Sequence, residues 1–204
     1  MNLGLAAATF AVVVPAELPD KTFVSCVVLG ARYRPFPVWC GAAAGLVLQA
    51  GVGSAAGRLV ALAPHRVVEG VVAALFLAGA AYMLLRHESS EEHEGEMLAE
   101  EEAREIGTAG EPSSLRIAAT TFGVVALAEL GDLTQVVVAN LSARYRDALS
   151  VFVGSSVAFL LVAAVGVGAG RTIVRVVPLE LVRRVSGVVL LGLGIASAVA
   201  AAGG

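Results

Sequence analysis

The sequence predicts an all-α integral membrane protein whose six transmembrane helices form two inverted three-helix repeats. Two observations carry this prediction. The 204 residues are 57% hydrophobic with a mean hydropathy of +0.83, whereas soluble domains are about 45–50% apolar. A segment near the N-terminus also recurs in the second half of the chain, and an internal repeat of this kind indicates a duplicated architecture.

Six segments are apolar over about the 20 residues that a membrane-spanning helix needs. Four of them contain long uncharged runs, and the other two are interrupted only by a short charged motif. We expect the spans at residues 4–30, 37–60, 67–86, 116–142, 149–171 and 181–202.

The repeat defines the domain organisation. Residues 9–34 align with residues 121–146, and 15 of the 26 aligned positions are identical. An odd number of spans per copy forces the copies to cross the membrane in opposite directions, which is the inverted-repeat design of many secondary transporters. We expect the first repeat at 1–86, an acidic linker at 87–115 and the second repeat at 116–204.

The second span of each copy carries a stripe of small residues spaced by four or multiples of four. This spacing keeps them on one helix face, where neighbouring backbones can approach closely. Gln49 lies on this stripe, and we expect it to form an interhelical hydrogen bond rather than to bind a ligand. The stripe consists of Gly41, Gly45, Gly53 and Gly57 in the first copy and Gly154, Ala158, Gly166 and Gly170 in the second.

The linker concentrates the acidic charge, because ten of the 17 acidic residues lie in residues 86–116. Its composition is typical of a solvated, partly disordered loop. A metal-collecting role together with His87 and His93 is the alternative. Arginines near the span ends number nine on the linker side and four on the other side, which favours a cytoplasmic linker and both termini outside.

Several classes are disfavoured. The basic residues are scattered and form no patch with aromatics, so nucleic acid is not an expected partner. Cys26 and Cys40 show no CxxC spacing and make no disulfide framework. The first span lacks the basic region of a signal peptide, and its internal copy cannot be one, so we expect it to be structural.

The charged motif is Ala-Glu-Leu-Pro-Asp-Lys-Thr at residues 16–22 and Ala-Glu-Leu-Gly-Asp-Leu-Thr at residues 128–134. An ionisable side chain at membrane depth costs at least about 2.5 kcal/mol. Lys21 is the chain's one lysine and no arginine lies in either motif, so ion pairing alone does not account for four carboxylates. A functional role is therefore favoured over a packing role.

The spacing within each motif predicts a shared ligand. Glu and Asp three residues apart lie about 60° apart on a helix, and the inverted copies face one another. We therefore expect Glu17, Asp20, Glu129 and Asp132 to converge at the membrane midplane. Carboxylate oxygens suit calcium, manganese or magnesium rather than zinc or copper.

Thr22 and Thr134 can join this site only if the helices unwind. On an unbroken helix each would point about 200° away from the Asp two residues before it. Pro19 lacks an N–H group and its ring clashes with the carbonyl of residue 15, which predicts a break in the first span. Gly131 allows the fourth span to unwind in a similar but milder way.

Such a cluster couples metal to protons. Four carboxylates crowded at low dielectric cannot all stay ionised while the site is empty, because desolvation and mutual repulsion favour the protonated form. An arriving divalent cation would expel protons, and arriving protons would expel the cation. This competition, combined with alternating access, is cation/proton antiport.

At these residues the chain resembles the Golgi and bacterial manganese/calcium–proton antiporters, a family of the lysine-exporter superfamily. The resemblance rests on the doubled Glu-x-Gly-Asp-Lys/Arg-Thr/Ser motif, the six spans and the central acidic loop, and it covers nearly the whole chain. It implies export of manganese or calcium from the cytosol of a bacterial cell in exchange for protons, without a resident cofactor. It also implies one half-site of Glu17, Asp20 and Thr22 and another of Glu129, Asp132 and Thr134.

Two positions depart from the family motif. Pro19 replaces a glycine and Leu133 replaces a base. Gln135, three residues after Asp132, is expected as a neutral ligand, and Lys21 is expected to point away from Asp20. Because one base is missing, we hypothesise that one carboxyl stays protonated while metal is bound, so that Leu133→Lys would alter the pH dependence of transport.

Three alternatives stay open: an intramembrane aspartyl protease suggested by Leu130-Gly131-Asp132, a membrane scaffold without transport, and a transporter of another substrate. The protease requires two aspartates sharing a proton, whereas the repeat makes four acids equivalent, so we do not expect an enzyme. The expected partners are a divalent metal ion and membrane lipid, and a homo-oligomer is left open.

Overall fold

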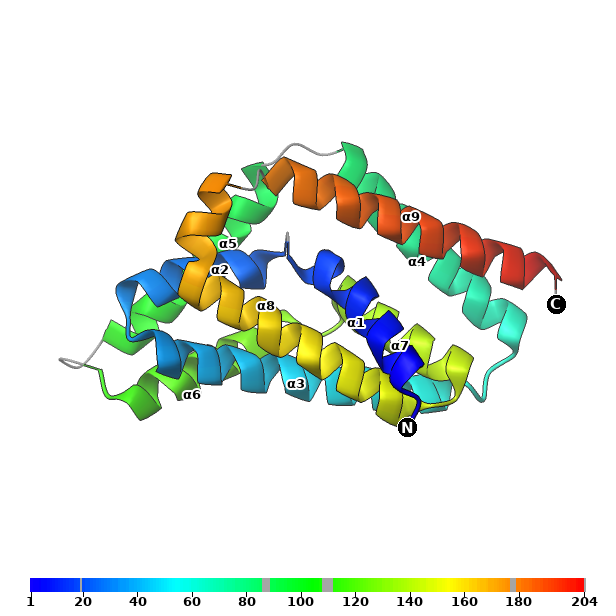
Figure 1. Cartoon of the computed structure of the whole chain (residues 1–204), viewed down its shortest axis with the longest axis horizontal. Helices are drawn as coiled ribbons and strands as arrows, with labels where there is room; N and C mark the ends of the chain where they lie inside the picture. Colours follow the sequence, from blue (N-terminus) through cyan, green and yellow to red (C-terminus); the bar gives the residue numbers. More distant parts are fainter. Residues whose placement is uncertain (19, 86–88, 108–111, 177–178, 204) are drawn as a thin grey trace.

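The computed structural model describes residues 1–18, 20–85, 89–107, 112–176 and 179–203, and all secondary structure within them is helical (Figure 1). This confirms the predicted all-α class. The helices are α1 (Leu3–Glu17), α2 (Lys21–Arg32), α3 (Pro35–Val60), α4 (His65–Leu85), α5 (Ser89–Gly107), α6 (Ser114–Ala128), α7 (Leu133–Tyr145), α8 (Ala148–Val176) and α9 (Leu179–Gly203).

The number of spans follows from two bent helix pairs. In the described residues, α3, α4, α8 and α9 are each long and apolar enough to cross a membrane. The pairs α1–α2 and α6–α7 pass the same test together but bend by 72° and 71°. Counting each pair as one broken span gives the six predicted spans. Both chain ends lie at one end of the molecule and α5 lies at the other (Figure 1), as three spans per half require.

The two halves pack against each other through matching pairs of helices. α3 packs on α6 and α7, α8 packs on α1 and α2, and α4 packs on α9. The second span of each repeat therefore holds the broken span of the other repeat. This arrangement brings the two acidic motifs, which are more than 100 residues apart in the sequence, to the same place between the halves.

The small-residue stripes lie at these contacts, as predicted. A Cβ atom added to Gly57 of α3 would lie 2.4 Å from the Ala139 carbonyl oxygen of α7, and one added to Gly154 of α8 would lie 2.3 Å from the Ala6 carbonyl oxygen of α1. Neither position has room for a side chain. Gly170 lies outside the residues whose side chains are described.

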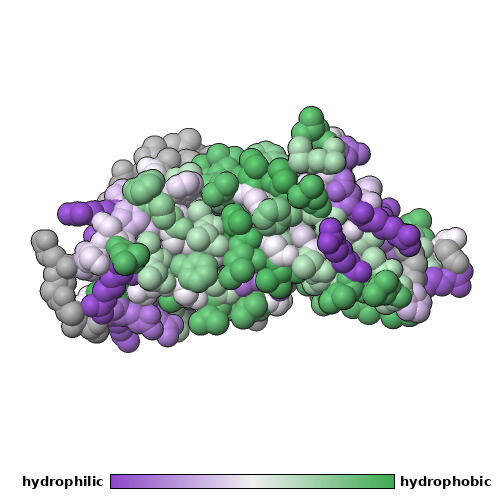
Figure 2. Space-filling model, turned by 90° about the horizontal axis from the view of Figure 1, so that it is seen from below, coloured by the Kyte–Doolittle hydropathy of each residue, from purple (hydrophilic) through white to green (hydrophobic). Residues whose placement is uncertain are grey.

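The exposed surface fits a membrane. Apolar side chains cover the middle of the face in Figure 2, and hydrophilic ones gather toward its two ends. Large apolar residues on the paired helices α4 and α9 are exposed, among them Leu75, Val188 and Ile195. A lipid environment removes the cost of exposing such residues to water.

The acidic linker differs from the sequence prediction. We expected a solvated, partly disordered loop, whereas residues 89–107 form α5, and one face of α5 packs on α2. Ala99, Glu102 and Ile106 are 0% exposed, and the Tyr33 hydroxyl donates to the Ala103 carbonyl at 3.2 Å. These buried residues recur at helical spacing, and this amphipathic pattern within the glutamate run explains the docking.

Among the acidic residues of α5 whose side chains are described, Glu102 is the one that is buried. Its carboxylate lies 3.5 Å from the Ser25 hydroxyl of α2. Burial raises the pKa of Glu102 to about 8, with the Ser25 hydrogen bond opposing the rise and Glu105 adding to it. The α2–α5 contact therefore contains a group that titrates near neutral pH.

We expect the docking of α5 on α2 to weaken as the pH rises from 4.5 toward about 8. An undocked Glu102 regains the ordinary pKa of 4.5, so the docked state binds the proton more tightly. The stabilisation is complete below pH 4.5 and is lost as the pH passes through the docked pKa. Hydrogen exchange of the α5 amides, corrected for the intrinsic rate, measures this. Glu102→Gln should remove the pH dependence of this exchange, whereas Glu96→Gln, at an exposed position of α5, should keep it. Exchange that does not change with pH in the wild type would contradict the raised pKa of Glu102.

Gly57→Ala should destabilise the fold by about 1–3 kcal/mol, the usual cost of overpacking a tight contact, because the new methyl group meets the α7 backbone. Gly123→Ala in α6 is the matched control, since a Cβ there has nothing within 4 Å, and it should be neutral or stabilise by up to about 1 kcal/mol. Thermal unfolding in detergent compares the two. Equal effects of both changes would mean that α3 and α7 are not in close contact.

Candidate metal-binding site

Both acidic motifs lie at the helix breaks, and each Asp caps the helix that follows. Asp20 is the N-cap of α2 and accepts from the Thr22 amide at 3.2 Å, and Asp132 is the N-cap of α7 and accepts from the Thr134 amide at 3.3 Å. The backbone leaves the helical path at these residues. This unwinding turns both threonines toward the acids, as the sequence predicted.

The two breaks contain different residues, Pro19 in the first and Gly131 in the second. Gly131 has φ +80°, a conformation that favours glycine. The bend there is 71°, so the expectation of a milder break is wrong. Pro19 lies outside the described residues. In a regular helix the Pro15 carbonyl would accept a hydrogen bond from the N–H of residue 19, which a proline lacks. Here this carbonyl accepts a hydrogen bond from the Ser186 hydroxyl of α9.

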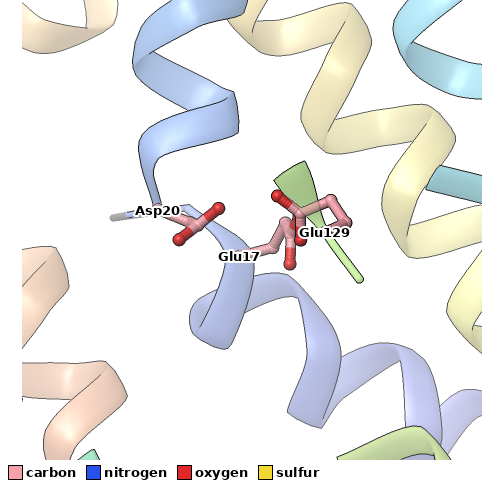
Figure 3. A group of neighbouring side chains, drawn as sticks. All are labelled: Glu17, Asp20 and Glu129. Atoms are coloured by element: carbon pink, nitrogen blue, oxygen red, sulfur yellow. The ribbon is translucent and has the colours of Figure 1, made fainter. Parts of the chain in front are cut away.

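Three carboxylates from the two repeats meet at the breaks (Figure 3). One oxygen each of Glu17, Asp20 and Glu129 lies within 4.8 Å of the others. Glu17 is 0% exposed and Glu129 is 3% exposed. Neither carboxylate oxygen of Glu17 accepts a hydrogen bond of regular geometry from the described residues, and the Thr134 side chain of the other repeat interacts with it. Because burying carboxylates close to one another is costly without a compensating positive charge, this arrangement indicates an oxygen-ligand cation site.

The threonine of the first motif connects the two repeats. The Thr22 hydroxyl donates to a Glu129 oxygen at 2.5 Å, and Thr22 itself is buried at 1% exposure. Thr134 is the corresponding buried residue of the second repeat, at 4% exposure. The first half-site therefore orients a carboxylate of the second.

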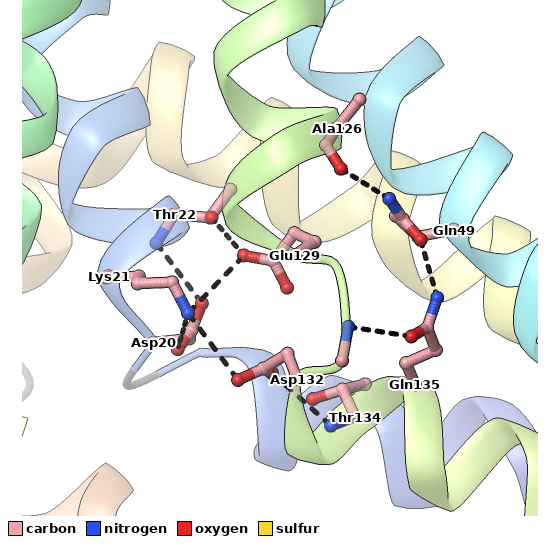
Figure 4. A network of polar contacts seen from close by, with 10 residues as sticks. Asp20, Lys21, Thr22, Gln49, Ala126, Glu129, Asp132, Thr134 and Gln135 are labelled. Carbon is pink, nitrogen blue, oxygen red and sulfur yellow. Dashed lines mark hydrogen bonds and ion pairs between the residues drawn. The ribbon is translucent and has the colours of Figure 1, made fainter.

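Asp132 lies at the rim of this group. Its side chain is 23% exposed and contacts the Lys21 ammonium at 3.5 Å. The same Lys21 Nζ lies 3.8 Å from Asp20 and 3.9 Å from Glu129 (Figure 4). The expectation that Lys21 points away from Asp20 is therefore wrong. Lys21 is the first residue of α2, directly after the break, so ordinary helical spacing does not govern its side-chain direction.

Gln135 connects neighbouring groups rather than facing the carboxylate cluster. Its Oε1 accepts from the Gly131 amide at 2.9 Å and its Nε2 donates to Gln49 Oε1 at 2.6 Å. Gln49 in turn donates to the Ala126 carbonyl at 2.5 Å, which confirms the predicted interhelical role of Gln49. The pair ties the α6–α7 break to α3 (Figure 4). A ligand role for Gln135 stays a prediction and would require this network to open.

A cavity of about 140 Å³ adjoins the site on the side of α4 and α9. Asp20, Asp132 and Thr134 line it from the breaks, and Tyr82 and Met83 line it from α4. Leu133, which stands where the family motif has a base, lines the same cavity and packs against Gly79 of α4. The residues that follow the two motif aspartates thus differ in their surroundings. Lys21 reaches the acids, whereas Leu133 packs on α4.

The linker alternative gains no support. Within the described ranges, the motif acids are the one group of three potential ligands close enough to share a metal ion. His93 is exposed on α5, and His87 lies outside the described residues.

Two features of the site region differ from what the sequence predicted. The position of Lys21 could have been suspected from its place immediately after a predicted helix break. The packing of α5 on α2 could have been found from the small and apolar residues at 95, 99 and 106, which share one helix face.

Six apolar spans in two inverted halves, with a buried oxygen-ligand site at paired helix breaks, define a membrane transporter of cations. Comparison with known families agrees. The chain belongs to the GDT1 family of divalent cation/proton antiporters, whose family model matches residues 5–91 and 117–204. This confirms the resemblance predicted from the doubled motif, and the family is one of transporters rather than enzymes.

The chain is also similar to a bacterial protein named "Putative manganese exporter" from Vibrio cholerae serotype O1. The two are 29% identical over 187 residues, which cover 90% of this chain and 84% of the relative. No solved structure matches the chain.

Glu17→Gln should raise the stability of the metal-free protein and abolish stabilisation by Mn²⁺. The change removes one negative charge from a buried group of acids that repel one another in the metal-free protein, and it also removes a cation ligand. For the wild type, Mn²⁺ at about 100 times its Kd should add about 2.7 kcal/mol. Thermal unfolding with and without Mn²⁺ measures both effects.

Glu69→Gln is the control for this pair of effects. Glu69 is equally buried, at 2% exposure, but it lines a different cavity with Asn140 and Arg144. The Glu69→Gln protein should keep the response to Mn²⁺. An undiminished Mn²⁺ response in Glu17→Gln would exclude Glu17 as a ligand.

Proposed function

We propose that this chain exchanges manganese for protons across the membrane and moves the metal out of the cytosol. The observation that carries the proposal is the group formed by Glu17, Asp20 and Glu129, whose oxygens lie within 4.8 Å of one another although they come from opposite repeats. A cation bound there contacts both halves, so a movement of one half against the other changes its access.

The chemistry of the group supports a divalent cation. Carboxylate oxygens, with Thr22, Thr134 and Asp132 at the edge, form a hard ligand set suited to manganese and calcium. Manganese is preferred here because the relative from Vibrio cholerae is named for it. Calcium can use the same oxygens and is the alternative substrate.

Competition supplies the coupling. Protons and metal ions bind the same carboxylate oxygens, so protons that enter from one side release the metal, and the metal that enters from the other side releases protons. The chain's residues provide the carboxylates, the threonine that orients Glu129 and the two breaks that expose backbone groups near the site. Export from the cytosol is proposed because the relative from Vibrio cholerae is named an exporter, and an inward proton gradient would drive the metal outward in such an exchange.

Proteoliposomes with a trapped pH indicator should show proton flux driven by a Mn²⁺ gradient. Asp20→Asn should reduce this flux at least about tenfold, which corresponds to about 1.4 kcal/mol, because one ligand loses its charge. Glu69→Gln is again the control and should retain most of the flux. The same assay with Ca²⁺ and Mg²⁺ ranks the substrates. Absence of flux with every divalent cation for the wild type would refute the proposal.

A further inference from the structure

Lys21 places its ammonium group next to the carboxylates and contacts acids of both repeats. Its Nζ lies between 3.5 and 3.9 Å from Asp132, Asp20 and Glu129. Two of these three acids, Asp20 and Glu129, also belong to the group that can share a metal ion. An ammonium group and a divalent cation cannot both stay next to these oxygens without strong mutual repulsion.

The same lysine also lines a second acidic space. A cavity of about 470 Å³ lies between the α1–α2 break and α5, and its walls include Lys21 together with Glu94, Glu100 and Glu101. Arg104 of α5 lines it as well. The Lys21 side chain is 21% exposed, so it has a path from the buried acids to this cavity. A long, flexible lysine stem allows the ammonium group to move while the backbone stays in place.

The duplication leaves this lysine without a counterpart. Leu133 occupies the equivalent position of the second repeat and packs against Gly79 of α4. α5 follows the first repeat and packs mainly on α2, with a smaller contact to α6. The chain therefore combines one base with one acidic cavity on the linker side of the site.

We propose that Lys21 is a tethered cation that occupies the carboxylate site when metal is absent and moves into the α5 cavity when metal binds. This inference rests on the proposed function and adds a positioning residue to it. With metal absent, the ammonium group offsets part of the repulsion among the site acids. With metal bound, Glu94, Glu100 and Glu101 receive it, so the linker helix takes part in each transport cycle.

A double-mutant cycle in equilibrium Mn²⁺ binding tests the movement. Lys21→Gln should tighten Mn²⁺ binding by roughly threefold to tenfold, because the competing cation is gone. The double variant Glu100→Gln/Glu101→Gln, which keeps Lys21, should bind Mn²⁺ more weakly by a similar factor, because the displaced ammonium group loses its acceptors. In the Lys21→Gln background the same α5 changes should have no effect.

Glu96→Gln is the matched control, since it removes a charge from an exposed residue of α5 that does not line the cavity, and it should leave binding unchanged. An α5 effect of equal size in both backgrounds would overturn the proposal, because it would reflect long-range attraction of the metal rather than displacement of Lys21. Weaker binding by Lys21→Gln would also overturn it.

A measurement on the unmodified chain guards against misfolding of the variants. Lys21 is the one lysine in the sequence, so lysine labelled with ¹³C at Cε yields a single Cε signal in NMR. Saturating Ca²⁺, a diamagnetic probe of the same site, should shift this signal. An unshifted signal at a Ca²⁺ concentration that calorimetry shows to be saturating would overturn the proposal. Absence of any divalent binding or flux in the wild type would instead refute the proposed function.

Discussion

Glu17 and Glu129 face one another in the buried centre of the molecule, and each comes from a different half of the chain. Each interacts with the motif threonine of the other repeat: Glu17 with the Thr134 side chain, and Glu129 with the Thr22 hydroxyl, which donates a hydrogen bond to it. Buried carboxylates of this kind are stable only with a proton, a base or a metal ion beside them. The rest of the fold brings a proton, a base or a metal ion to these carboxylates and allows one of them to replace another.

The helix breaks follow from this constraint. A continuous span would place Asp20 and Thr22 on different faces and would leave no free backbone groups near the acids. Breaking each span after its glutamate makes each aspartate an N-cap, which uses its carboxylate to satisfy the next helix and places Asp20 in the group of three acids and Asp132 at its rim. The tight contacts of α3 and α8 with the opposite broken spans then fix the distance between the two half-sites.

Much of this arrangement could be predicted from the sequence, because duplication and helix-breaking residues leave local signals. The repeat predicted two converging half-sites, and Gly131 predicted a break at its own position. The side-chain direction of Lys21 and the docking of α5 could not be predicted in the same way. Both depend on tertiary contacts between segments distant in sequence. In α5 the many glutamates also make the pattern of small and apolar residues on its buried face difficult to recognise.

Anomalous diffraction from crystals containing Mn²⁺ would show whether the two repeats hold one metal ion jointly. We expect one strong anomalous peak in bonding contact with Glu17, Asp20 and Glu129. A peak bound to the acids of α5 alone, or to the carboxylates of one repeat without the other, would contradict it.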